Sequence, residues 1–216
     1  MTISGLEVAA ALERACQRLL TLRDQLNTLD AAIGDGDSGL TAEKGALGAL
    51  EYLRSSPPGD DLGRWLIDLG AAYNRAAPST MGALVATAQL RAGKLILAQP
   101  ELTGELLAQM LLEADAGIQQ RGKSKPGDKT IVDALHPAAL AFAAAIEAGA
   151  SLEAAGQAML SAARAGRDEA RLLRSKVGRA GWVGERTAGQ LDPGTVLFVS
   201  ALEVVLGIPA SHQESR

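Results

Sequence analysis

The segment that decides the fold reads Leu29-Asp30-Ala31-Ala32-Ile33-Gly34-Asp35-Gly36-Asp37-Ser38-Gly39. Glycine is unfavourable inside helices and strands, and aspartate competes for the backbone in non-helical conformations, so we expect a turn here. Its three aspartates, Asp30, Asp35 and Asp37, fall within eight positions and would repel one another unless a cation lay between them. Mg²⁺ and Ca²⁺ bind carboxylate oxygens well. The apolar residues before the glycines would carry the turn into the protein, which favours a metal site over a solvated acidic loop.

On both sides of this segment, apolar residues recur at helical spacing. A first apolar stripe spans residues 12–26, and Thr103 and Ser151 are expected helix N-caps. Asp192-Pro193 combines an N-cap with proline at the first helical position, which is a strong start signal. The pattern predicts an all-α bundle or barrel of about eight helices, the later ones near residues 39–53, 62–73, 81–97, 103–118, 130–148, 151–174 and 193–207.

The composition is ordinary for a soluble globular chain, with 47% hydrophobic and 21% charged residues. A length of 216 residues predicts one domain, residues 1–216, and the net charge of −4 argues against a nucleic-acid partner. Cys16 is the single cysteine, so it forms no internal disulfide and is expected in the core. Without a basic, apolar leader or a run of about 18 apolar residues, we expect no signal peptide and no membrane span, and a cytoplasmic protein.

Four glycine-rich loops carry polar groups, at residues 34–39, 78–82, 122–130 and 178–194. Three of them run directly into a helix start, where backbone N–H groups bind anions such as phosphate. If the helices run up and down, these loops gather at one end. Together with the aspartates, they suggest a pocket for a magnesium nucleotide.

Two familiar motifs do not apply. Residues 117–124 match the P-loop pattern letter for letter, but that motif works only between a buried strand and a helix. An amphipathic helix is predicted before the segment, and Pro126-Gly127 breaks the chain just after it. An EF-hand would need glutamate at the twelfth position from Asp35, where Ala46 stands. We expect neither motif to function.

No covalent nucleophile is evident in the chain. His136 lies inside a helical stretch and His212 lies in the tail, so each is expected to be structural or solvated. No Ser-His-Asp or Cys-His arrangement is suggested. This favours metal-assisted transfer over covalent catalysis.

The basic candidates lie in the third and fourth loops. Arg179, set among glycines, is suited to clamp a phosphate bidentately, and a surface arginine is the alternative. Lys123, Lys125 and Lys129 are expected on the solvated surface, with Lys129 the strongest candidate for another role.

Taken in order, four sets of segments resemble the nucleotide-binding L subunit of dihydroxyacetone kinases, and the likeness covers essentially the whole chain. Leu29-Asp30 through Gly34-Asp35-Gly36-Asp37 is similar to the family's metal loop. The other matching segments are Gly82-Ala83-Leu84 through Thr87 with Arg91-Ala92-Gly93; Arg121-Gly122-Lys123 with Pro126-Gly127-Asp128-Lys129-Thr130; and Gly178-Arg179-Ala180 with Gly184-Glu185-Arg186 and Asp192-Pro193-Gly194.

The resemblance implies a barrel of eight antiparallel amphipathic helices with the nucleotide at one end. Asp30, Asp35 and Asp37 would hold two Mg²⁺ ions against the phosphates of ADP or ATP and, with Arg179, would serve catalysis. The phosphoryl acceptor would be dihydroxyacetone or a related small ketose, bound to a histidine of a partner K subunit. The residues implied around the nucleotide are Ser38, Gly39, Leu40, Thr41, Thr80, Met81, Gly122, Ile131, Arg179, Asp192, Pro193 and Gly194.

Two departures from the family pattern leave the mode of phosphoryl transfer open. Ser38 stands where phosphotransferase-system versions carry histidine, and residues 78–82 read Pro-Ser-Thr-Met-Gly instead of Gly-Gly-x-Ser-Gly. Proline removes a backbone N–H, and the loss of glycines restricts the close approach of the backbone to a phosphate. This loop must therefore bind the phosphates differently from the family pattern.

Three modes follow from the resemblance. The length of a lone subunit favours a retained ADP that a phosphotransferase-system protein rephosphorylates. Ser38 favours a kinase in which ATP binds and exchanges as an ordinary substrate, for example one that acts on an erythrulose-like ketose. A non-catalytic nucleotide-binding regulator is the third possibility.

Overall fold

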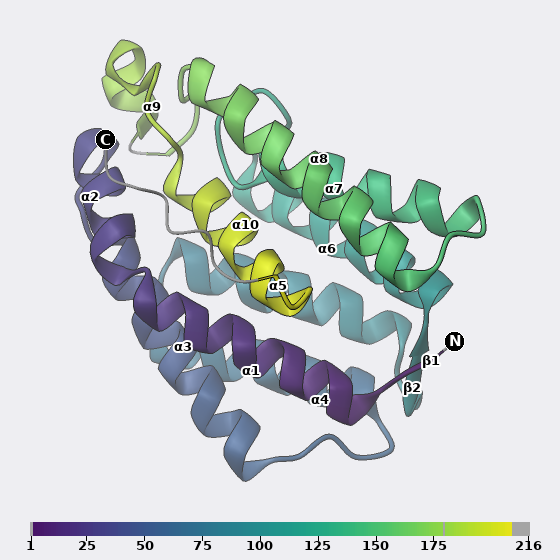
Figure 1. Cartoon of the computed structure of the whole chain (residues 1–216). Helices are drawn as coiled ribbons and strands as arrows, with labels where there is room; N and C mark the ends of the chain where they lie inside the picture. The colour runs from purple at the N-terminus through teal and green to yellow at the C-terminus, as the bar shows by residue number, and fades with distance from the viewer. Residues whose placement is uncertain (1, 179, 209–216) are drawn as a thin grey trace.

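A computed structural model describes residues 2–178 and 180–208, and most of this chain is helical (Figure 1). In chain order its elements are β1 (Thr2–Ser4), α1 (Gly5–Thr21), α2 (Arg23–Ile33), α3 (Ser38–Ser55), α4 (Leu62–Ala76), α5 (Thr80–Leu95), β2 (Glu101–Thr103), α6 (Gly104–Gly122), α7 (Val132–Glu147), α8 (Leu152–Leu172), α9 (Ala180–Val183), the 3₁₀-helix η1 (Gly184–Thr187) and α10 (Pro193–Val205).

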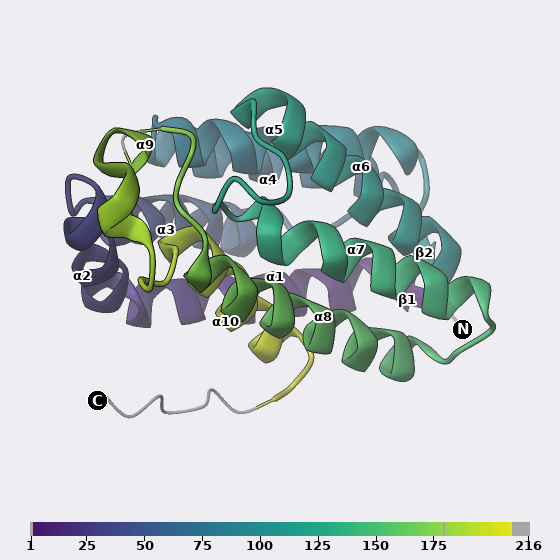
Figure 2. The same ribbon diagram turned by 90° about the horizontal axis from the view of Figure 1, so that it is seen from above.

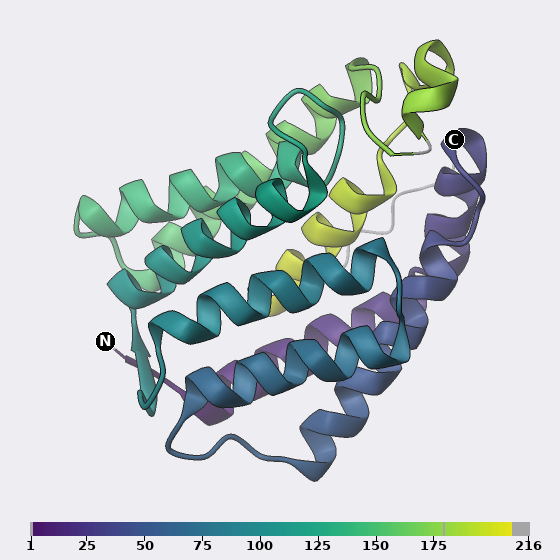
Figure 3. The same ribbon diagram turned by 180° about the vertical axis from the view of Figure 1, so that it is seen from behind.

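The long helices close into a barrel. Each packs on the next in the order α1, α3, α4, α5, α6, α7, α8 and α10, and α10 packs back on α1. Successive helices of this ring run in opposite directions, as Figures 1 and 3 show from the front and from behind. Helix α2 extends the end of α1 and packs on α3. The predicted all-α barrel is confirmed.

The up-and-down course brings the glycine-rich loops to one end of the barrel. The α2–α3, α4–α5 and α6–α7 connections and the segment between α8 and α10 all lie there. Figure 2 shows α9 and the end of α2 at this end, with β1 and β2 at the other. The four loops are therefore neighbours in space, as the sequence suggested.

The predicted helix starts carry the expected caps. The Thr103 hydroxyl accepts a hydrogen bond from the N–H of Leu106 at 3.2 Å, and Ser151 caps α8 through the N–H of Ala154 at 3.1 Å. Asp192 accepts from the N–H of Thr195 at 2.8 Å, ahead of Pro193 at the start of α10. These side chains satisfy N–H groups that have no partner within the helix.

Three local expectations were wrong. The first apolar stripe is divided between α1 and α2 at Leu22, whose N–H bonds Leu19 three residues back. The acidic segment is not a loop throughout, because Asp30 lies in the last turn of α2 and Ser38 begins α3. The two three-residue strands were missed; they pair antiparallel with Ile3 opposite Leu102. Strands this short give too few residues for an alternating pattern.

The core forms two main clusters. One joins α1, α3, α4 and α5, and the other joins α6, α7, α8 and α10. Cys16 is buried in the first cluster as expected, and burial raises the pKa of its thiol to about 11. The P-loop-like segment lies largely within α6, so it does not form a phosphate loop. Among the described helices, none combines the length and the apolarity needed to cross a bilayer.

Candidate functional site

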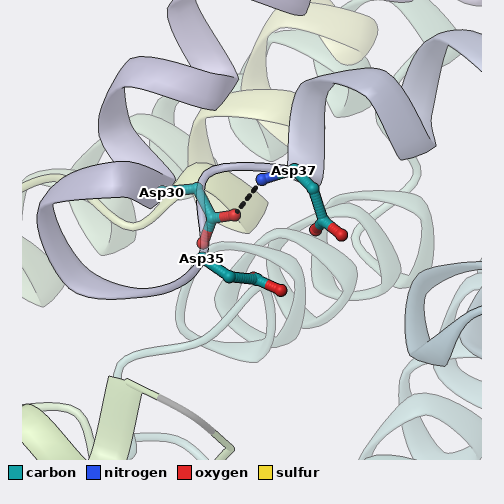
Figure 4. A group of neighbouring side chains, drawn as sticks. All are labelled: Asp30, Asp35 and Asp37. Carbon is teal, nitrogen blue, oxygen red and sulfur yellow. Dashed lines mark hydrogen bonds between the residues drawn. The ribbon is translucent and has the colours of Figure 1, made fainter.

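Three carboxylates meet between α2 and α3. Asp30 comes from the last turn of α2, Asp35 from the turn, and Asp37 from the residue that precedes α3. Each offers an oxygen within 4.8 Å of the others, and the three side chains surround a common space (Figure 4). Asp35 and Asp37 are exposed, and the turn therefore faces outward rather than into the protein as the sequence suggested.

Main-chain hydrogen bonds to side chains of α2 hold this turn in place. Oδ2 of Asp30 accepts from the N–H groups of Asp37 and Ser38, at 2.9 and 3.1 Å. Oδ1 of Asn27 accepts from the N–H groups of Gly39 and Leu40, at 2.8 and 3.1 Å. Helix α3 is thus capped by side chains of α2, and Asp37 makes no capping bond of its own.

Two glycines permit this close arrangement. A Cβ added at Gly34 would lie 2.4 Å from Oδ1 of Asp30, and one at Gly39 would lie 1.9 Å from the carbonyl oxygen of Arg23. Atoms cannot approach so closely. Glycine at 34 leaves room for the Asp30 carboxylate, and glycine at 39 lets α3 cross the backbone of α2.

The donor set fits a hard divalent cation. All three groups supply carboxylate oxygen, the ligand that Mg²⁺ and Ca²⁺ prefer. Mg²⁺ is commonly held by one or two carboxylates together with substrate phosphates and water. The site is open on one side, which suits an ion shared with a phosphate group.

Beside the aspartates lies a cavity of about 320 Å³ formed by all four glycine-rich loops. Its walls combine carboxylates, hydroxyls, one lysine and small apolar side chains. The lining residues are Asp30, Ile33, Gly34, Asp35, Thr80, Leu84, Gly122, Ser124, Lys129, Thr130, Ile131, Val177, Gly178, Ala180, Asp192 and Pro193.

A second cavity, of about 370 Å³ and mostly apolar, continues from the first into the barrel. The two share Thr80, Leu84, Thr130, Ile131 and Asp192. The cavity beside the aspartates therefore adjoins a more apolar one.

The predicted site residues divide into four groups. Asp30, Asp35, Thr80, Gly122, Ile131, Asp192 and Pro193 line the polar cavity. Met81 and Gly194 line the apolar one. Asp37 joins the carboxylate group, while Ser38, Gly39, Leu40 and Thr41 follow it in the first turns of α3, outside both linings. Arg179 lies outside the described residues.

The altered second loop has its own capping arrangement. Oγ of Ser79 accepts from the N–H of Gly82 at 3.1 Å and donates to the carbonyl of Ala77 at 3.2 Å. Ser79 is thereby engaged with the backbone, whereas Thr80, the first residue of α5, faces both cavities. The N-termini of α5 and α10 both open on the polar cavity, and helix N-termini favour anions.

Asp192 is the most perturbed acid of the site. Burial raises the pKa of Asp192 to about 7, the hydrogen bond from the N–H of Thr195 lowers it, and the charge of Asp133 raises it further. A half-buried carboxylate with a raised pKa that faces two cavities is poised to be protonated near neutral pH or to be neutralised by a cation.

The sequence missed two features of the site. Lys129 is 2% exposed rather than solvated; desolvation lowers the pKa of its ammonium, and the charge of Asp192 opposes this shift. Asn27 holds the start of α3 from twelve residues away, and no local pattern announces that role. The Pro-Gly-Asp-Lys-Thr stretch was the available hint for Lys129.

Comparison with known proteins agrees with this geometry. Residues 32–207 match the family described as the DAK2 domain. The chain is 31% identical over 201 residues to the Escherichia coli PEP-dependent dihydroxyacetone kinase, ADP-binding subunit DhaL, covering 92% of this chain and 95% of that protein. It is 32% identical over 209 residues to the L-erythrulose kinase of Pectobacterium atrosepticum, covering 96% of this chain but 35% of that protein.

A solved structure extends the likeness to three dimensions. The dihydroxyacetone kinase of C. freundii in complex with AMP-PNP and Mg²⁺ matches with a TM-score of 0.72 and 25% identity, over 93% of this chain and 33% of that one. This chain thus spans about a third of that kinase and of the erythrulose kinase. With the family match over most of its length, the barrel and the aspartate turn, the chain belongs to the DAK2 domain family.

Proposed function

We propose that this chain binds a magnesium nucleotide and transfers its phosphoryl group to a small hydroxyketone, dihydroxyacetone or a related ketose, held by a partner. The observation that carries the proposal is the carboxylate group of Asp30, Asp35 and Asp37 at the edge of a cavity flanked by helix N-termini. Phosphoryl transfer needs positioning and charge neutralisation rather than a protein nucleophile.

The three carboxylates would hold two Mg²⁺ ions, which neutralise the phosphate charge. The hydrogen bonds of Asp30 and Asn27 fix the turn, so that the carboxylates need little rearrangement on binding. The aliphatic side chains of Ile33, Leu84 and Ile131 suit the nucleoside, and the N-termini of α5 and α10 suit its phosphates.

The hydroxyketone would be held by a partner K subunit. In the family that the chain resembles, the ketose is bound through a histidine of the K subunit, and the one described histidine of this chain, His136, is not placed for that role. His136 lies outside both cavity linings with Nδ1 2.7 Å from Oδ2 of Asp115, and His212 lies outside the described residues. The open edge at Asp35 and Asp37 is where the partner would deliver its substrate. The proposal puts this reaction in the cytoplasm.

We favour a phosphotransferase-system type of kinase, in which ADP stays bound and a phosphoryl donor protein recharges it. The 31% identity to the E. coli ADP-binding subunit over nearly all of that protein supports this type. The alternative is an ATP-consuming kinase. It is supported by the similarity to an erythrulose kinase and by Ser38, whose hydroxyl donates to the carbonyl of Leu26 at 3.1 Å where a histidine would stand in the relay type.

The nucleotide content of the purified protein tests the proposal. Protein prepared in Mg²⁺ without added nucleotide is denatured, and the supernatant is separated by anion exchange. Stoichiometric ADP supports the relay, whereas an empty protein that binds Mg-ATP reversibly supports the ATP-consuming kinase. An empty protein that binds neither nucleotide refutes both.

A coupled kinase assay with a K partner then separates enzyme from regulator. Turnover that Asp35→Ala abolishes supports the enzyme. Binding without turnover in the intact protein supports a non-catalytic regulator, to which the altered 78–82 loop would correspond.

A further inference from the structure

The α6–α7 connection contains a buried lysine that forms no ion pair with a carboxylate among the residues that the structure describes. Lys129 is 2% exposed, and its backbone has a φ of 60°, in the left-handed region. Lysine is rarely buried unless its ammonium is paired. The reason for this burial must lie in the groups that surround Nζ.

Those groups are four main-chain carbonyls. Nζ donates to the carbonyl oxygens of Arg171 and Leu173, both at 3.0 Å, and of Thr187 and Gln190, at 2.6 and 2.7 Å. An ammonium has three N–H donors, so four acceptors saturate it. Hydrogen bonds from a charged donor are roughly twice as strong as neutral ones, and more so away from water.

The four carbonyls belong to the two ends of one segment. Arg171 and Leu173 lie at the end of α8, while Thr187 is the last residue of η1 and Gln190 follows it. The segment between these ends supplies Val177, Gly178 and Ala180 to the wall of the polar cavity. Lys129, three residues before α7, therefore binds the backbone on both sides of that wall, at residues 171–173 and at residues 187–190.

Neighbouring bonds depend on the same closure. The N–H of Gly189 donates to the carbonyl of Arg171 at 2.8 Å, and the N–H of Ser175 donates to Oγ1 of Thr187 at 2.8 Å. Thr187 is fully buried. Removing the ammonium would leave the carbonyls of Leu173 and Gln190 without a donor among the described residues, and burying unsatisfied acceptors is costly. The carbonyls of Arg171 and Thr187 would keep the N–H groups of Gly189 and Gln190.

We propose that Lys129 is a positioning residue of the nucleotide site: its ammonium joins residues 171–173 to residues 187–190 and so fixes the wall of Val177, Gly178 and Ala180, against which the nucleotide binds. The role in binding rests on the function proposed above. Lys129 acts on the wall through the four carbonyls that its ammonium binds, so the closure consists of bonds within the chain.

The first test compares Lys129→Met with the exposed, same-loop control Lys125→Met. Methionine is unbranched at Cβ like lysine, so the left-handed backbone is no more strained. We expect Lys129→Met to weaken Mg-ADP affinity in calorimetry by about tenfold to a hundredfold, the range of hydrogen bonds to a charged group, and Lys125→Met to change it less than twofold. Equal affinities of Lys129→Met and the wild type overturn the proposal.

The second test needs no nucleotide. We expect faster amide exchange at Ser175 and Gly189 in Lys129→Met, and a higher midpoint of thermal unfolding for Lys129→Ala in n-propylammonium, which replaces the deleted side-chain atoms. Sodium at the same ionic strength and the bulkier tert-butylammonium should not reproduce this rise. Unchanged exchange, or no rise specific to n-propylammonium, overturns the closure. A wild type that binds no nucleotide refutes the proposed function while these two measurements still decide the closure.

Discussion

Replacing Asn27 by alanine tests how the metal turn is held. Oδ1 of Asn27 accepts from two N–H groups at the start of α3, those of Gly39 and Leu40, at 2.8 and 3.1 Å. Both N–H groups precede the point at which intrahelical bonding begins, and Asp37 provides no capping bond in compensation. Asn27→Ala therefore leaves two half-buried donors unsatisfied.

The expected cost follows from those two bonds. Losing a capping acceptor costs about 0.5–2 kcal/mol, and leaving a buried donor unsatisfied costs about 1–3 kcal/mol. We expect Asn27→Ala to lower the free energy of unfolding by about 1–3 kcal/mol, which for a chain of this size lowers Tm by about 2–10 °C. Because the same bonds orient Asp37, Mg-ADP affinity should fall as well.

Urea denaturation and a thermal scan, both in EDTA, measure the stability change without a metal contribution. Thr28→Ala is the matched control, because Thr28 is exposed on the same helix and its hydroxyl donates to the carbonyl of Asp24 within that helix. We expect this control to stay within about 0.5 kcal/mol of the wild type. The reasoning is refuted if Asn27→Ala matches Thr28→Ala in both stability and Mg-ADP affinity.

Three further changes probe the site. Asp37→Asn should weaken Mg-ADP binding by about tenfold or more in calorimetry yet leave Tm in EDTA unchanged or higher, because it relieves carboxylate repulsion; unchanged affinity would remove Asp37 from the metal site. Gly39→Ala should destabilise by about 1–3 kcal/mol in urea because its Cβ would lie 1.9 Å from the Arg23 carbonyl, whereas Gly59→Ala, with open space around it, should not. Asp192→Asn keeps the helix cap but cannot ionise. Because burial raises the pKa of Asp192 to about 7, ionisation of the wild-type carboxyl lowers the stability of the folded state as pH rises from about 4 to about 7. In EDTA the free energy of unfolding of the variant should therefore rise relative to that of the wild type across this pH range, by at most about 4 kcal/mol, and a constant difference would contradict the raised pKa.

The sequence predicted what local chemistry determines. Thr103, Ser151 and Asp192-Pro193 begin helices because their side chains or ring act within three residues of the start. The glycine-rich loops gather at one end because short connections make neighbouring helices antiparallel. These two rules were enough to predict the barrel class and the grouping of the site loops from the amino-acid sequence alone.

What the sequence missed depends on contacts between distant residues. The ammonium of Lys129 meets the carbonyl of Gln190, 61 positions away, and the Pro-Gly-Asp-Lys-Thr stretch around Lys129 could not reveal so distant a partner. The strand pair joins Ile3 to Leu102 across most of the first half of the chain. The bend at Leu22 likewise reflects the packing of α2 on α3 beyond the end of α1 rather than a helix-breaking residue.

The two sides of the site belong to different parts of the core. The carboxylates and Thr80 come from helices of the first cluster, whereas Gly122, Thr130 and the wall at Val177 come from or follow helices of the second. Helix α10 joins the clusters, since Val196 packs in the first and Val199 in the second.

The polar cavity therefore exists only when the ring of helices has closed, and its acidic side is set independently of its opposite wall. Asn27 and Asp30 fix the acidic side through hydrogen bonds to residues 37–39, which lie close by in the chain. Lys129 fixes the opposite wall through bonds that reach Gln190 in the C-terminal part of the chain. A nucleotide that touches both sides would add contacts across this division, so its binding would stabilise the closed barrel as well as align the phosphates. That arrangement explains why the connections between α2 and α3, between α6 and α7 and between α8 and α10 contain so many hydrogen bonds although they contain no long helix.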